Sequence, residues 1–228
     1  MAEGLFSADL FRFLSDLRKH NDRTWFAKNK ERYLDSVLES ALEFVRSFGP
    51  YLSKISPHFV ADDRPSGGSV FRIYRDVRFS KDKSPYKTQV GISFRHRGGR
   101  DVHTPGYYLH LEPGTIFAAA GIWHPDRDTL TRIRTTIIDK PQLWKKAAHG
   151  PEFRSRYHLS GDSLKRAPAG FDPDHPLAED LRWKDYVGVS MLDEDTVTSQ
   201  DFIPLYADIC RAGTPFMRFL CGAVGVPF

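Results

Sequence analysis

Residues 106–123, "GYYLHLEPGTIFAAAGIW", decide the fold. Apolar and polar side chains alternate up to Glu112, which is the two-residue period of a β-strand with one buried face. Pro113-Gly114 marks a turn, and a small-residue, apolar segment follows it. We expect antiparallel strands over 107–112 and 115–123. The connecting loop should exceed two residues, because Pro-Gly suits a type II turn better than the usual hairpin turns.

The same period is present upstream of this hairpin. Residues 70–79, "VFRIYRDVRF", alternate apolar and charged side chains, and residues 90–95 alternate again. Successive strands joined by short turns are typical of an antiparallel meander. The sequence therefore predicts an antiparallel sheet of at least four strands over about 70–123.

Helical periodicity flanks this region on both sides. A sheet between two sets of helices is the α+β class, and no repeat or shift in composition divides the chain. We expect one domain over 1–228, with the sheet packed against N-terminal and C-terminal helices. The helices are expected over about 7–20, from about 22 to Gly49-Pro50, near 126–138, from Pro141 to Gly150, around 178–185 and near 200–221.

Positive charge is concentrated beside the first expected strand, in residues 72–88, "RIYRDVRFSKDKSPYKT". From Arg72 to Arg100 the chain has nine basic and two acidic residues, a net charge of +7, whereas the whole chain carries +4. A basic region on a slightly acidic body indicates an anionic partner at one place.

Location follows from what the sequence contains. Cys210 and Cys221 are too few for a disulfide framework and are expected to be buried thiols in a reducing compartment. The N-terminus lacks the pattern of a signal peptide, and no apolar stretch approaches the roughly 20 residues that cross a bilayer. The expected location is the cytoplasm, with no membrane partner.

Four segments together resemble the DUF2461 family, in the right order and over nearly the whole chain. The resemblance implies an α+β domain and supplies no catalytic residues. The segments are "FLSDLRKHNDRTWFAKNKERY" at 13–33, "FRIYRDVRFSKDKSPYKTQVG" at 71–91, "GYYLHLEPG" at 106–114 and "LKRAPAGFDPDHP" at 164–176.

The arginines of the basic region have structural as well as functional interpretations. On one strand Arg72 and Arg78 would lie roughly 20 Å apart, too far to bind one phosphate. Asp76 can pair with Arg78 on the same face, as surface ladders do. Arg75 would point into the apolar face, and it therefore needs a β-bulge or a buried carboxylate from a helix.

The loop that follows is a candidate anion site. Ser84-Pro85 makes a turn that lets Lys83 and Lys87 converge, with Tyr86 covering them. Lysine supplies a mobile positive charge for a phosphate or carboxylate. The alternative is an ordinary solvated, lysine-rich hairpin.

The polar face of the third expected strand carries Tyr108, His110 and Glu112. His110 is a candidate general base, although neighbours at i and i+2 on a strand point the same way without being in contact, and a structural histidine is the alternative. His124 starts a helix and could border the same site. The segment "GFDPDHP" resembles a metal site, but Asx turns explain its aspartates, so we expect no metal and no cofactor.

We therefore expect an anionic small-molecule ligand, possible catalysis by residues that the sequence does not identify, and no nucleotide or hydrolase motif. Nucleic acid is an alternative partner, because rings between cations can stack on bases. A non-enzymatic scaffold with structural charges is a further alternative. The candidate ligand-binding residues are Arg72, Arg75, Arg78, Lys83, Lys87, Tyr108 and His110.

Overall fold

The computed structural model describes residues 4–99 and 104–228, so Arg100 at the end of the basic region lies outside the described residues. Within these residues one antiparallel five-stranded sheet has the strand order β1-β2-β3-β5-β4. The α+β class is confirmed. The strands are β1 (Val90–Arg95), β2 (Gly106–Glu112), β3 (Thr115–Ile122), β4 (His158–Ser160) and β5 (Tyr186–Leu192).

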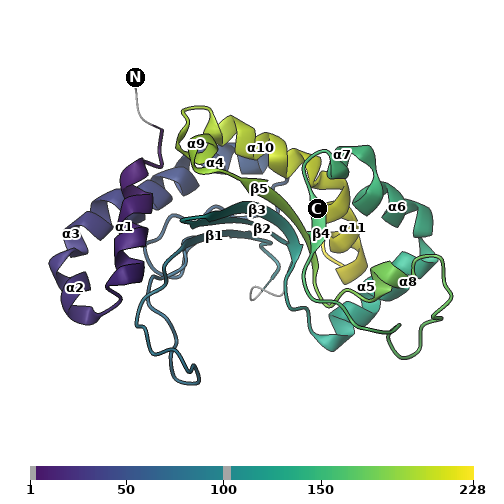
Figure 1. Cartoon of the computed structure of the whole chain (residues 1–228). Coiled ribbons are helices and arrows are strands. Elements are labelled where there is room, and N and C mark those ends of the chain that lie inside the picture. The colour runs from purple at the N-terminus through teal and green to yellow at the C-terminus, as the bar shows by residue number, and fades with distance from the viewer. Residues whose placement is uncertain (1–3, 100–103) are drawn as a thin grey trace.

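The sheet is arched, with helices over its convex face and an open concave face (Figure 1). The convex face holds the core: Tyr107, Leu109 and Leu111 of β2 are fully buried. Phe48 of α4 (Ser40–Ile55) packs on Phe94 of β1 and on Tyr206 of α10 (Phe202–Ala212), with ring centroids 4.9 and 4.8 Å apart. Burial of these large rings fixes which face of the sheet stays open.

The N-terminal helices form a nearly continuous run that joins the convex core. We expected it to end at Gly49-Pro50, but Pro50 lies inside the last helix, which continues to Ile55. The extra turn buries Leu52, and this burial offsets the cost of an interior proline. The elements are α1 (Ala8–Lys19), α2 (Arg23–Lys28), α3 (Lys30–Tyr33), the π-helix η1 (Leu34–Glu39) and α4 (Ser40–Ile55).

Helices after β3 form one end of the arch and cover its convex face, while the N-terminal helices form the other end (Figure 1). The start at Pro141 and the stop at Gly150 are confirmed for α6. The helices expected near 200–221 are α10 and α11, which lie on the convex side (Figure 1). The elements are α5 (Arg127–Asp139), α6 (Pro141–His149), α7 (Pro151–Arg154), α8 (Ala178–Leu181), α9 (Glu194–Thr198), α10 (Phe202–Ala212) and α11 (Thr214–Val224).

The strand expected at 70–79 is wrong. This segment touches the sheet only near Val70, which makes an isolated bridge to Ile92. It then leaves and pairs with the chain returning from 85–87, through a Tyr74–Tyr86 bridge. The result is a separate basic arm, residues 72–88, that hangs below the sheet (Figure 1). An arm that pairs with itself satisfies its backbone without the sheet.

The remaining two strands come from a region where we expected none. β5 pairs with β3 and β4 pairs with β5, which extends the sheet beyond the hairpin. The alternating "YVGVSML" of β5 is the signal, and it lies in the connection between the helices expected around 178–185 and near 200–221.

The hairpin loop is tighter than expected. Glu112 pairs directly with Thr115, so only Pro113 and Gly114 connect the strands. Gly114 has φ +85°, a conformation that glycine adopts without a steric penalty. This short loop sets the register in which His110 faces Phe117 and Tyr108 faces Ala119.

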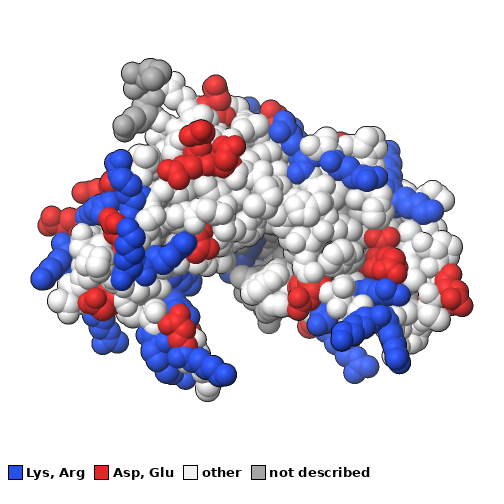
Figure 2. All heavy atoms as spheres, in the orientation of Figure 1, with Lys and Arg blue, Asp and Glu red and all other residues white. Residues whose placement is uncertain are grey.

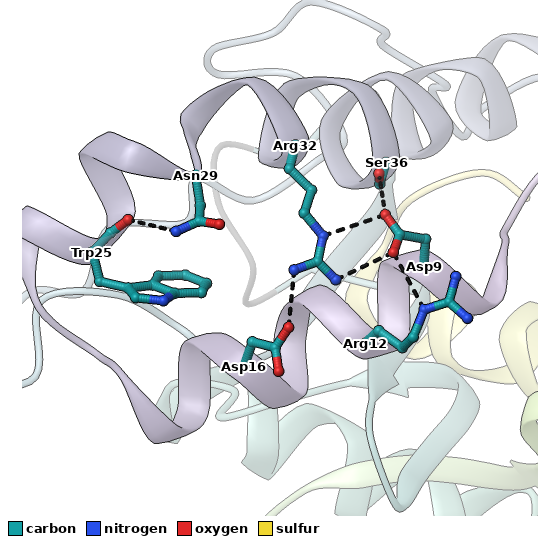
Figure 3. Close-up of polar contacts among 7 residues, drawn as sticks. All are labelled: Asp9, Arg12, Asp16, Trp25, Asn29, Arg32 and Ser36. Atoms are coloured by element: carbon teal, nitrogen blue, oxygen red, sulfur yellow. Dashed lines mark hydrogen bonds and ion pairs between the residues drawn. The ribbon is translucent and has the colours of Figure 1, made fainter.

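A polar cluster holds the N-terminal helices together (Figure 3). Arg32 of α3 donates to Asp16 at 2.9 Å and to Asp9 at 3.2 Å, and both acceptors belong to α1. Ser36 of η1 donates to Asp9 at 2.7 Å. The hydrogen bond from Ser36, followed by the contact with Arg32, lowers the pKa of Asp9 to about 2. The cluster fixes α1, from which Arg18 reaches the sheet.

Candidate functional site

A groove of about 510 Å³ lies on the concave face of the sheet. Its floor is formed by alternate residues of β1, β2 and β3, because side chains on a strand alternate between the two faces. Figure 2 shows this side hollowed between two basic lobes, the arm at the lower left and the loop between β4 and α8 at the lower right. The groove is lined by Phe71, Lys87, Gln89, Gly91, Ser93, Arg95, Thr104, Gly106, Tyr107, Tyr108, His110, Phe117, Ala119, Ala120, Gly121, Trp123 and Val187.

Small residues create this space. Ala119 and Gly121 of β3 lie under it, where larger side chains would fill it. Gly91 of β1 has a more specific role: a Cβ there would lie 2.7 Å from the Tyr108 hydroxyl and 3.0 Å from the Phe71 ring. The sequence therefore leaves room at Gly91 for the tip of Tyr108.

Three polar side chains of β2 form a continuous chain along the floor, which we call the relay: Tyr108, His110 and Glu112. The Tyr108 hydroxyl lies 3.0 Å from His110 Nδ1, and His110 Nε2 lies 3.2 Å from Glu112 Oε2. We expected neighbours at i and i+2 on the strand not to be in contact, but these three residues are. Long side chains lean along the strand and close the gap.

Neighbouring elements fix Glu112 and His110 of the relay. Arg18 of α1 donates to Glu112 Oε1 at 3.0 Å, and Thr88 of the arm donates to the same oxygen at 3.2 Å. The His110 ring stacks on Phe117, with centroids 4.6 Å apart and planes 10° apart. The imidazole is thus held between a ring of β3 and a carboxylate fixed by α1.

The hydrogen bonds assign the protons of the relay. The Glu112 carboxylate accepts from Arg18, so His110 Nε2 carries the proton that it donates to Glu112. In the neutral ring Nδ1 then accepts from the Tyr108 hydroxyl. Burial lowers the pKa of His110, although Glu112 opposes this shift. Burial, with a smaller contribution from Glu112, raises the pKa of Tyr108 to about 12. Both groups are therefore neutral near pH 7.

Lys87 brings a half-buried ammonium group to the edge of the groove. Its Nζ donates to the Arg72 carbonyl at 2.9 Å and lies 5.5 Å from the centre of the Phe71 ring. Burial, followed by the charge of Arg72, lowers the pKa of Lys87. Among residues 4–99 and 104–228, no carboxylate forms an ion pair with it.

Three of the other predicted cations of the arm, Arg75, Arg78 and Lys83, have partners within the arm. Arg75 pairs with Asp82, a carboxylate of the loop and not of a helix. Arg78 pairs with Asp76 at 2.6 Å, as expected if the two residues form a surface ion pair and do not bind a ligand. Lys83 donates to the Val77 carbonyl at 2.9 Å.

The seven predicted site residues therefore separate into groups. Lys87, Tyr108 and His110 line the groove. Arg75 and Lys87 border a neighbouring hollow of about 650 Å³, where Asp76 and Asp82 add negative charge. Arg72, Arg78 and Lys83 line neither space.

Sequence reasoning missed several residues that build the site, above all Phe71, Gly91, Phe117 and Arg18. The hairpin register could have found Phe117, because a two-residue loop places it opposite His110. Arg18 carried no such signal, since it reaches Glu112 across 94 residues of sequence.

Two further candidates from the sequence have local explanations. Asp172 accepts from the Asp174 backbone at 2.9 Å, which is the expected Asx turn. His124 has φ 49°, and its backbone donates to the buried Asp185 at 2.6 Å.

Two general features, a cluster of metal ligands and a membrane-spanning helix, are absent from the described residues. No group of three or more potential ligands there is placed to hold a metal ion. No helix in this part of the chain has the length and apolarity to span a bilayer.

The fold and the site thus define a class of protein: an arched α+β domain whose open groove holds the hydrogen-bonded chain of Tyr108, His110 and Glu112. Residues 9–219 match the family described as conserved hypothetical protein (DUF2461), and the chain belongs to that family. Comparison with curated proteins and with solved structures gave no significant match.

Proposed function

We propose that the groove binds a small molecule with an apolar, ring-containing body and one anionic group. The observation that carries this proposal is the half-buried Lys87 ammonium, which borders a mainly apolar groove without a carboxylate partner in the described part of the chain. Apolar pockets with a few placed polar groups are typical of small-molecule sites.

Lys87 is the group that would meet the anion. Its ammonium has three donors, and the Arg72 carbonyl takes one of them. Burial lowers its pKa because the charged form is poorly solvated. A carboxylate or phosphate beside it would supply the missing counter-charge, as in other charge-assisted pairs.

The remaining lining suits the body of such a ligand. Phe71 and Phe117 present ring surfaces, and Ala119 leaves depth between the strands. Aromatic rings pair favourably with other rings in offset or edge contacts. The neighbouring hollow fits an anion less well, because Asp76 and Asp82 line it.

Calorimetric titration of phenylacetate, phenyl phosphate and neutral phenylacetamide tests this proposal. The two anions should bind and the amide should bind much more weakly. Lys87→Met should weaken anion binding about 10- to 100-fold, as the loss of a charge-assisted hydrogen bond would. Arg78→Ala, the matched control in the arm, should stay within about twofold of wild type. Equal binding by wild type and Lys87→Met, or an equal loss in Arg78→Ala, would contradict the proposal.

Single-stranded nucleic acid is a second candidate, favoured by one observation. Phe79 in the arm is 96% exposed, and Arg78 lies over its ring at 5.9 Å. Base stacking on such a ring contributes about 1–3 kcal/mol. Fluorescence anisotropy of a labelled oligonucleotide, measured against salt, distinguishes the two candidates. Nucleic-acid binding would weaken steeply with salt and would require Phe79, whereas phenylacetate binding would not require Phe79.

A further inference from the structure

The relay has the three-part connection that proton-transfer sites use: a hydroxyl, an imidazole and a carboxylate in series. It lies on the floor of the groove, with Tyr108 and His110 lining the space and Glu112 anchored behind them. We propose that Tyr108, acting through His110 and Glu112, takes the proton of a weakly acidic hydroxyl group on the ligand of this groove. This inference rests on the proposed function and names the second chemical group of the ligand.

The proton transfer balances without any other reactant. The ligand O–H bond breaks, and its electron pair stays on the ligand oxygen. The Tyr108 oxygen gains that proton while its own proton passes to His110 Nδ1. His110 becomes an imidazolium that still donates from Nε2 to Glu112. Tyr108 then donates to the ligand oxyanion, so the same hydroxyl accepts from the acid and donates to its conjugate base.

The charged and titratable groups around His110 favour this direction. From its own strand, Tyr108 and Glu112 contact the two ring nitrogens. From α1, Arg18 holds Glu112, and two further cations, Lys87 of the arm and Arg95 of β1, line the same groove. β3 contributes only the Phe117 ring, which stacks on the imidazole. Glu112 would stabilise the imidazolium, and Lys87 would stabilise the anionic ligand.

In the free protein, His110 Nδ1 carries no proton, so the relay can accept one from the ligand. His110 has its pKa lowered by burial, so Nδ1 is free of a proton near pH 7. Tyr108 has its pKa raised to about 12, so its hydroxyl keeps its proton until it can pass to His110.

The packing around Tyr108 sets the position of its oxygen. Gly91 leaves the space that the hydroxyl occupies, and the Phe71 ring lies 6.0 Å from the Tyr108 ring. Lys87 contacts the same Phe71 ring from the arm. The expected ligand class is therefore an aromatic or similarly apolar acid that also carries a phenol or enol hydroxyl.

The test uses 4-hydroxy-3-nitrophenylacetate, whose phenol titrates near neutrality and whose phenolate absorbs visible light. The matched probe is 3-nitrophenylacetate, which lacks the hydroxyl. Spectrophotometric titration of the first probe on wild type should show its phenol pKa lowered by about one unit or more on binding, about a tenfold shift in the ionisation equilibrium. Tyr108→Phe and His110→Gln should abolish this shift, and a separate titration of each variant with 3-nitrophenylacetate measures what the substitution itself does to binding.

The controls separate the possible failures. Arg78→Ala should keep the full phenol shift, and the ¹⁵N chemical shifts of His110 should report a proton on Nε2 in the free wild-type protein. A bound probe that keeps its solution pKa, or a shift that persists in both relay variants, would overturn the proton-transfer role and leave the binding proposal standing. Failure of both nitrophenylacetates to bind would overturn the binding proposal as well.

Discussion

The basic arm and the floor of the groove are both rich in polar side chains, but the ion pairs of the arm join residues close in sequence, whereas the Arg18–Glu112 ion pair on the floor joins residues far apart in sequence. In the arm, Arg78 pairs with Asp76 two residues away and Arg75 pairs with Asp82 seven residues away. On the floor, Arg18 of α1 holds Glu112 of β2, and the relay continues from there. Charges that neutralise one another within an exposed segment need no ligand, whereas groups aligned by separate elements in a groove can act on one.

The largest effect is expected at Gly91, where the floor tolerates no Cβ. Gly91→Ala would place a carbon 2.7 Å from the Tyr108 hydroxyl and 3.0 Å from Phe71. The crowding should lower the free energy of unfolding by about 1–3 kcal/mol and displace Tyr108 from His110. Urea denaturation measures the first effect, and the His110 ¹⁵N shifts measure the second.

Gly222→Ala is the matched control for Gly91→Ala. Gly222 lies within α11, and a Cβ there meets nothing within 4 Å. Because alanine favours helix more than glycine does, this variant should match or exceed wild type by up to about 1 kcal/mol. Equal stability of the two variants would show that the floor is less tightly packed than the structure has it.

The next largest effect is expected at the polar cluster around Arg32, which also joins separate elements. Arg32→Met keeps an unbranched apolar stem but removes the hydrogen bonds to Asp9 and Asp16. These contacts are partly exposed, so after solvent screening we expect a loss of about 1–2 kcal/mol at pH 7. Urea denaturation of wild type and variant measures the difference.

The same pair of proteins gives a pH dependence with a definite sign. The pKa of Asp9 is lowered from its ordinary value of 3.8 to about 2 by Ser36 and Arg32. A carboxyl with a depressed pKa in the folded state contributes stability above its unfolded pKa and loses it as the pH falls through the folded value. The advantage of wild type over Arg32→Met should be constant above about pH 5 and shrink between about pH 4 and pH 2. An advantage that grew on acidification would contradict this assignment.

A smaller effect is expected where the arm is anchored. The Asn21 side chain donates to the Tyr86 carbonyl at 2.9 Å and accepts from the Tyr86 amide at 3.1 Å. Asn21→Ala should cost about 1 kcal/mol or less globally, because the Tyr86 ring stays stacked on Phe26 at 4.1 Å. Hydrogen exchange of the Tyr86 amide should accelerate, and unchanged exchange would show that this anchor is unnecessary. Asp22 gives a control, since its side chain accepts from the Trp25 amide at the start of α2 and is not the residue that hydrogen-bonds to the Tyr86 backbone.

The comparison also explains how far the sequence could lead. The periods of β1 and β2 are visible in the sequence, whereas β3 is recognised by its apolar run directly after the Pro113-Gly114 turn. The same alternation at 70–79 was misleading: Ile73 is buried, but Phe79 is exposed at 96%. Periodicity reports a side-chain pattern and not a pairing partner, and this segment pairs with itself.

The candidate site was predictable to a similar degree. Tyr108, His110 and Lys87 were identified from residue type and spacing, and the groove brings these three together. Gly91 and Arg18 could not be identified, because their roles depend on contacts across strands and across 94 residues of sequence. The pairing of Arg78 with Asp76 was foreseen as a surface ladder, since the two residues are neighbours in the chain.

The smallest effect should be at that pair. Arg78 and Asp76 are solvent-exposed, so Arg78→Ala and Asp76→Ala should unfold in urea at the same midpoint as wild type within error. Neither variant should change phenylacetate binding or the phenol pKa of the nitrophenol probe, because neither residue lines the groove. The two variants change the net charge in opposite directions, so any long-range field of the arm would appear as opposite shifts in affinity at low salt. Such opposite shifts would mean that the arm steers anions toward the groove. The arm would then influence the ligand through its long-range electric field, although it makes no contact with the ligand through these two residues.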